Sequence, residues 1–249
     1  MIGSAGMAGE DAPERDRLVG VGVAIAATLL AGLANGSVGT PGAGWRPGPL
    51  AYAAVVGGLA ASLVGIAALG RPRDAPVGLG LPSPTDLGLA ALGSAGTLAV
   101  GAVGVAAIGS LGVAVPQPNL LEPALEGGPG WPTGPVRLLW TLPLVVLALV
   151  PAEEAVFRLA VQRRLAAGAG PRAAVAGSAG LFALYSVPLF AGGSAAATTL
   201  AAALVAILAA GWGELHRRTG NLLVPITAHA ALYLVGLGAL YWLAAGARA

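Results

Sequence analysis

Seven long apolar runs decide what this sequence can fold into. A helix that crosses the hydrocarbon core of a bilayer needs about 20 predominantly apolar residues. Runs close to this length are separated by charges, prolines and glycines, and they span residues 18–34, 50–69, 87–115, 138–159, 173–190, 195–212 and 222–244. No small-residue cleavage site follows the short first run, so we expect a retained helix there and not a signal peptide. The sequence predicts an all-α, polytopic transmembrane bundle of about seven spans.

The charges of this chain are too few and too scattered for most other classes of protein. Only 10% of the residues are charged and 56% are hydrophobic. In a soluble domain, about 25% of the residues are charged and about 45–50% are apolar. All 13 basic residues are thinly spread arginines, which excludes the basic face of a nucleic-acid-binding domain. The chain has no cysteine, which excludes disulfides, iron–sulfur clusters and a cysteine nucleophile. We expect membrane lipid and no nucleic acid among its partners, and a multi-pass location in the cell (plasma) membrane.

The arginines also predict how the chain is oriented, because cytoplasmic loops carry an excess of basic residues. With seven spans, the segments before the first span and after the second, fourth and sixth hold nine arginines, at positions 15, 17, 71, 73, 163, 164, 172, 217 and 218. The opposite side holds three, at positions 46, 137 and 248. We therefore expect the N-terminus inside and the C-terminus outside. The chain then divides into a charged cytoplasmic tail, residues 1–17, and one transmembrane domain, residues 18–249.

Ionisable side chains inside the apolar runs are the main indication of function, since each costs roughly 2.5–3.5 kcal/mol at the centre of a membrane helix. The fourth run contains Glu153, Glu154 and Arg158. On a helix, Glu154 and Arg158 are neighbours that can pair, while Glu153 points about 100° away from Glu154. Such a pairing would hold one carboxylate and leave the other as a proton acceptor. The alternative is an ordinary charged helix end near the lipid headgroups.

The depth of these residues favours a buried site over a charged helix end. At about 1.5 Å per residue, Glu153 lies about 15 Å along its helix from Arg163 at the inner side. By the same rise, Ser186 lies about 20 Å from the inner end of its run and His229 about 10 Å. Tyr233 follows His229 by one further turn. A packed, hydrogen-bonded side chain is the common alternative for a single histidine. Taken together, the three runs predict a polar site that opens to the cytoplasmic side.

Three short motifs lie in the fourth, fifth and seventh runs: Glu153-Glu154-x-x-x-Arg158, Phe182-x-x-x-Ser186 and His229-x-x-x-Tyr233. In this order they resemble the EExxxR, FxxxH and HxxxN (or HxxxD) motifs of the CPBP family, the CAAX-protease and bacteriocin-processing proteins, also called the Abi family. This family includes the type II CAAX prenyl endopeptidases. The run from Arg218 into His229 is also similar to the family's approach to its last motif. The resemblance covers a core of about residues 137–240.

The resemblance implies an intramembrane endopeptidase that acts on a membrane-associated peptide or protein, such as a CAAX-like or leader-peptide substrate. It implies Glu153 as the general base that activates a water and His229 as the oxyanion donor. Glu154 and Arg158 would orient the site, and Phe182 would anchor the second motif. We expect no cofactor and no metal, because one histidine beside two acids makes a poor zinc site.

Two motif positions depart from the family pattern and leave activity open. Ser186 replaces a histidine and does not titrate near neutral pH, and a positioned acid–base group is typically worth about 10²–10⁴-fold in rate. Tyr233 replaces an asparagine but keeps an O–H donor. Tyr185 is expected to face another side of its helix. His216, expected in the inner loop, could reach the site only by a re-entrant contact.

Other functions remain as alternatives. A catalytically impaired relative could serve as a membrane scaffold or an immunity-type protein, which the departures at Ser186 and Tyr233 favour. A transporter or proton relay through the charged cluster is a further alternative, but the chain lacks the internal repeat of many transporters. A Ser186–His229 nucleophilic dyad would lack an orienting acid.

Overall fold

The structure is a computed structural model, and it describes residues 49–70, 78–114, 130–132, 136–190 and 193–246 together with the single positions 19, 22 and 26. The predicted N-terminal tail and all but three positions of the predicted first span lie outside the described residues. Side chains are described as far as Gly236.

The described chain is helical, as the apolar runs predict. Four of its helices are long and apolar enough to cross a membrane, namely 49–70, 84–110, 171–190 and 195–219. The elements in chain order are α2 (Pro49–Gly70), α3 (Pro84–Ser110), α5 (Val136–Leu144), η2 (Val145–Leu149), α6 (Val150–Glu154), η3 (Ala155–Gln162), α7 (Arg163–Ala169), α8 (Pro171–Ser186), η4 (Val187–Phe190), α9 (Ala195–Thr219) and α10 (Leu223–Gly246).

Local sequence signals fix where these helices begin and end. Ser83 caps α3 by accepting a hydrogen bond from the Asp86 amide, and Asp86 accepts one from the Ser83 amide in return. This reciprocal capping box satisfies amides that a helix start leaves unpaired. Ser194 is the N-cap of α9 in the same way, and Gly220 is its C-cap, directly after the last helical residue. The φ of 64° at Gly220 is a left-handed conformation that glycine adopts without strain.

The fourth predicted span is one helical run from Val136 to Ala169, but two π-helical stretches, η2 and η3, interrupt its α-helical hydrogen bonding. Pro143 lies just before the first stretch and Pro151 just after it. Because proline has no N–H to donate and crowds the preceding turn, the regular ladder cannot pass through these positions. The short α6 between the stretches carries Glu153 and Glu154, and both side chains are buried. π-helical turns occur often at functional sites.

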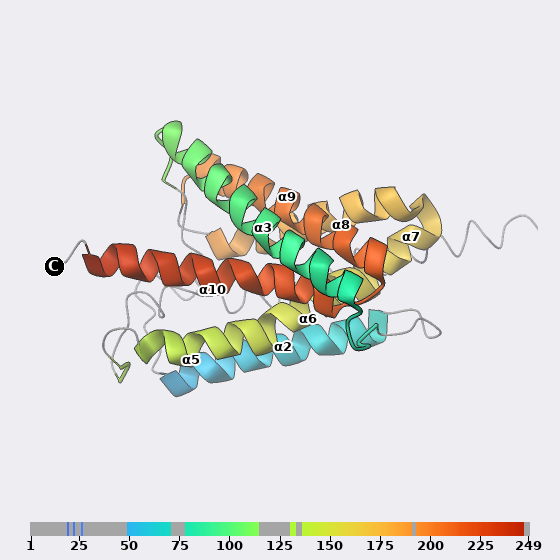
Figure 1. The fold of residues 1–249 in the computed structure, drawn as a ribbon, viewed down its shortest axis with the longest axis horizontal. Helices are drawn as coiled ribbons and strands as arrows, with labels where there is room; N and C mark the ends of the chain where they lie inside the picture. The colour runs from blue at the N-terminus through green and yellow to red at the C-terminus, as the bar shows by residue number, and fades with distance from the viewer. Residues whose placement is uncertain are drawn as a thin grey trace, which may run out of the picture.

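Helix α10 lies in the middle of the bundle (Figure 1), with α3 and α9 on one side of it and α2, α5 and α6 on the other. It packs against α3, α9, α6 and η2, and α8 packs against α9 and η3. The segment before α3 is tied to the turn between α9 and α10: the Leu222 amide donates to the Gly78 carbonyl at 2.7 Å, and the Asn221 side chain donates to the Gly80 carbonyl at 3.1 Å. These contacts anchor the start of α10, the helix that carries His229.

The close approach at Gly78 generates a stability prediction. Gly78 has a φ of 69°, and a Cβ there would lie 2.2 Å from the Gly220 carbonyl oxygen. Gly78→Ala should therefore lower the free energy of unfolding by about 1–3 kcal/mol, measured by unfolding in detergent. Gly80→Ala is the matched control, since a Cβ there meets no described atom within 4 Å. Equal losses in the two variants would contradict this account of the turn.

Candidate active site

Glu154 lies at the centre of a buried polar cluster that three helical segments build. One of its carboxylate oxygens accepts a hydrogen bond from Arg158 Nε at 2.7 Å. The other lies 3.0 Å from Nδ1 of His229 on α10. All three side chains are 2% exposed or less. Arg158 is one helical turn from Glu154, as the spacing predicts, whereas the contact with His229 joins residues 75 positions apart.

The contact with Glu154 determines which His229 nitrogen remains available. A carboxylate paired with arginine is ionised and can only accept hydrogen bonds, so the 3.0 Å contact requires a proton on His229 Nδ1. The other nitrogen, Nε2, points toward Glu153 and lies 3.9 Å from its Oε2. This distance is too long for a direct hydrogen bond, and it is the kind of separation that one water can bridge.

Glu153 has one bonded and one unbonded carboxylate oxygen. The Tyr185 hydroxyl on α8 donates to Oε1 at 2.9 Å. Oε2 is buried and has no hydrogen-bond partner among the described residues. A buried carboxylate oxygen without a donor is costly in a folded protein. Its position opposite His229 Nε2 therefore calls for a polar group between the two, such as a water or a substrate atom.

Arg158 is held from the side opposite Glu154. Its Nη1 donates to Gln162 Oε1 at 3.3 Å and to Ser178 Oγ at 3.4 Å. Gln162 in turn donates to the Gly213 carbonyl on α9 at 3.0 Å. A Cβ at Gly213 would lie 3.1 Å from both Arg158 Nη1 and Gln162 Oε1, so glycine lets α9 approach this network. These contacts fix the guanidinium that orients Glu154.

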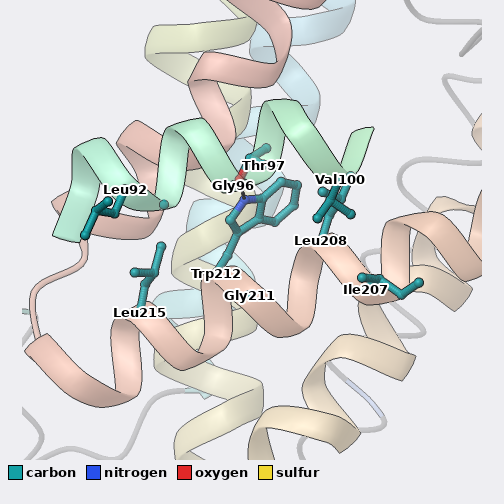
Figure 2. A pocket seen from close by; sticks show the side chains of 10 residues that line it. Leu92, Gly96, Thr97, Val100, Ile207, Leu208, Gly211, Trp212 and Leu215 are labelled. Atoms are coloured by element: carbon teal, nitrogen blue, oxygen red, sulfur yellow. Dashed lines mark hydrogen bonds between the residues drawn. The ribbon is translucent and has the colours of Figure 1, made fainter. Parts of the chain in front are cut away.

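The His229 ring is stacked on Trp212 of α9, with ring centroids 3.8 Å apart and planes 16° apart. The Trp212 indole N–H donates to Thr97 Oγ1 on α3 at 2.9 Å, and Figure 2 shows this contact. Trp212 also lines a groove of about 340 Å³ between α3 and α9, together with Leu92, Gly93, Gly96, Thr97, Val100, Ile207, Leu208, Gly211 and Leu215. The indole thus lies between this groove and the His229 ring and sets the plane of the imidazole.

Phe182, the expected anchor of the second motif, packs against the other aromatic rings of the site. Its centroid lies 4.6 Å from that of Phe157, 5.9 Å from that of Trp212 and 5.8 Å from that of His229. Tyr233 also lies beside the site, with its ring 5.5 Å from the His229 ring. The polar cluster is therefore enclosed by aromatic side chains from η3, α8, α9 and α10.

The structure brings together Glu153, Glu154, Arg158 and His229 but leaves Ser186 out of their hydrogen-bond network. The buried Ser186 hydroxyl donates instead to the Phe182 carbonyl of its own helix at 2.9 Å. Serines often make this bond one helical turn back. The Ser186–His229 dyad considered from the sequence is therefore not formed.

Two expectations about neighbouring residues are wrong. Tyr185 does not face away from the site; it is 1% exposed and donates to Glu153. The sequence does indicate this position for Tyr185. Tyr185 and Ser186 lie three and four residues after Phe182, so both share its helix face. His216 lies in the last turn of α9 and not in a loop, and it is buried.

Within the described parts of the chain, no group of three or more His, Cys, Asp or Glu side chains is arranged to hold a metal ion. The site is instead built from two carboxylates, one imidazole and one guanidinium. Arg158 balances the charge of Glu154, whereas the contacts of Glu153 are the neutral Tyr185 hydroxyl and the more distant His229 ring.

The part of the chain that holds this site is similar to a known protein family. Residues 135–235 match the family model described as type II CAAX prenyl endopeptidase Rce1-like. The match includes all three motifs and is consistent with the CPBP family, so the resemblance stated from the motifs is confirmed. No curated protein and no solved structure matches the chain.

The buried ion pair generates a second stability prediction. Arg158→Met leaves Glu154 without its guanidinium in a buried environment, which typically costs about 3–5 kcal/mol. We expect this loss in the free energy of unfolding, measured in detergent. Arg218→Met is the matched control, because its partner Glu214 is shared with Arg217 and the Arg218 side chain is 59% exposed. Unchanged stability of Arg158→Met would mean that the pair is solvated.

Proposed function

We propose that this chain, which carries an Rce1-like domain of a protease family, is an intramembrane endopeptidase in which Glu153 activates the hydrolytic water. One observation carries the proposal: Oε2 of Glu153, which has no hydrogen-bond partner among the described residues, lies 3.9 Å from His229 Nε2. A water between these atoms would donate to a carboxylate that has no competing donor on that oxygen. The family match supports peptide hydrolysis as the chemistry.

The proposed reaction assigns one task to each charged group. As the water oxygen attacks the peptide carbonyl carbon, Glu153 takes the water proton and later delivers it to the leaving nitrogen, so that the C–N bond breaks. The carbonyl oxygen becomes negative and accepts a hydrogen bond from His229 Nε2, in the form of the ring that carries both protons. Glu154 holds Nδ1 of that ring at 3.0 Å, and Arg158 holds Glu154.

The proposed substrate is a peptide or protein anchored in, or attached to, the membrane, of the CAAX-like or leader-peptide class. Two observations support this choice. Four of the described helices have the length and composition of membrane spans, and the Rce1-like description concerns CAAX prenyl endopeptidases. The candidate site lies among these helices, with its glutamates, arginine and histidine almost fully buried. A substrate that partitions into the membrane would meet such a site at a high local concentration.

One observation favours a second candidate function, a non-catalytic relative that acts as a membrane scaffold or immunity-type protein. The buried hydroxyl of Ser186, at the position of the family's second-motif histidine, is bonded to its own backbone and brings no titratable group to the site. The two functions predict opposite results in one cleavage assay.

That assay uses the purified protein with a panel of membrane-anchored peptides and detects products by mass spectrometry. Glu153→Gln should reduce cleavage by about 10²–10⁴-fold, because the amide keeps the shape of the side chain and cannot accept the proton. Glu214→Gln, which alters a partly exposed carboxylate on α9, is the control and should cleave as the parent does. Cleavage that survives Glu153→Gln would reject the glutamate mechanism, and a parent that cleaves no peptide would favour the scaffold.

The proposal also includes a seven-span topology in the plasma membrane, with the N-terminus inside and the C-terminus outside. The nine-to-three distribution of arginines supports it. A reporter fused after Ala249 should be accessible only from outside the cell, and one fused before Leu18 only from inside. A cytoplasmic C-terminal reporter would show that the number of spans is not seven.

A further inference from the structure

We infer that Tyr185 is a positioning residue that turns the Glu153 carboxylate so that its Oε2 faces His229. The inference rests on the proposed function and adds a residue that the motifs do not include. The Tyr185 hydroxyl donates to Glu153 Oε1 at 2.9 Å, and both side chains are buried. A hydrogen bond from a fixed donor to one oxygen restricts rotation about the last bonds of the glutamate side chain. The second oxygen is then held on the side of His229.

The Tyr185 ring is itself fixed, which is what a positioning residue requires. Its centroid lies 5.3 Å from that of Phe157 on η3 and 5.7 Å from that of Phe182 on α8. These tilted and edge contacts are among the favourable arrangements of aromatic pairs. Since Phe157 lies on the same helical run as Glu153, the Tyr185 ring packs against the run that carries its hydrogen-bond acceptor. The hydroxyl is thus held in place before any substrate binds.

The two carboxylates of the site therefore each have their own orienting partner. Arg158 holds Glu154, and Tyr185 holds Glu153. The two partners differ in charge, and the difference matters for the chemistry. A neutral O–H donor orients Glu153 without the full positive charge that would make it a weak base. Glu153 keeps the capacity to take a proton on Oε2 while Oε1 stays bonded to Tyr185.

The test compares two hydroxyl deletions at adjacent positions of α8. Tyr185→Phe removes the donor to Glu153. Ser186→Ala removes a buried hydroxyl that, among the described residues, is bonded only to the Phe182 carbonyl. We expect Tyr185→Phe to lower kcat by about 10–100-fold, the equivalent of one hydrogen bond to a charged group, with KM nearly unchanged. Ser186→Ala should leave kcat within about two-fold of the parent. Incorporation of 4-aminophenylalanine at position 185 restores a donor and should recover most of the lost rate.

A second readout tests the same inference without any substrate. The infrared band of the Glu153 side chain, assigned by its loss in Glu153→Gln, should shift in Tyr185→Phe and stay in place in Ser186→Ala. An unshifted band, or a kcat for Tyr185→Phe equal to that of the parent, would overturn the inference. If the parent cleaves no peptide, the proposed function fails, and the infrared comparison alone decides whether Tyr185 holds Glu153.

Discussion

The rest of this site depends on the two contacts that the buried Glu154 carboxylate makes. It binds Arg158 Nε at 2.7 Å and His229 Nδ1 at 3.0 Å with its two oxygens. A buried charge is tolerated only when it is paired and hydrogen-bonded, and here one carboxylate pairs with an arginine and also contacts a histidine from a distant helix. Because Glu154 is occupied in this way, His229 presents Nε2 to the other glutamate. In the proposed mechanism, the different roles of the two adjacent acids follow from which of them Arg158 binds.

The backbone of the fourth run makes this arrangement possible. Consecutive residues of a helix point about 100° apart, yet Glu153 and Glu154 are both buried. Glu153 contacts Tyr185 on α8, and Glu154 contacts His229 on α10. Prolines and two π-helical stretches surround them and interrupt the regular α-helical ladder. Gly213 removes a side chain where α9 crosses Arg158 and Gln162. The departures from regular α-helix geometry therefore lie next to the buried polar cluster, on either side of Glu153 and Glu154.

The helices and the Glu154–Arg158 pair could be predicted from the sequence, whereas the contacts between distant helices could not. Apolar runs predict helices, since helix length and hydrophobicity are local properties, and the spacing of Glu154 and Arg158 predicts their pairing. The depth of His229 in its run predicts that it lies near these residues. Depth does not predict which glutamate His229 contacts, because that depends on the rotation of two helices about their axes. The motif spacing marks position 186 and not position 185, so the motif alone does not predict a role for Tyr185. The spacing from Phe182 places both residues on the same helix face.

The central claim is that a water lies between Glu153 Oε2 and His229 Nε2 while Glu154 holds Nδ1. An experimental structure in a lipid environment, at a resolution that shows ordered water, tests it most directly. The account predicts a water within about 2.7–3.2 Å of both atoms, with Arg158 on Glu154 and the Tyr185 hydroxyl on Glu153. A protein side chain bonded to Oε2, or Arg158 and His229 both bound to Glu153, would contradict it.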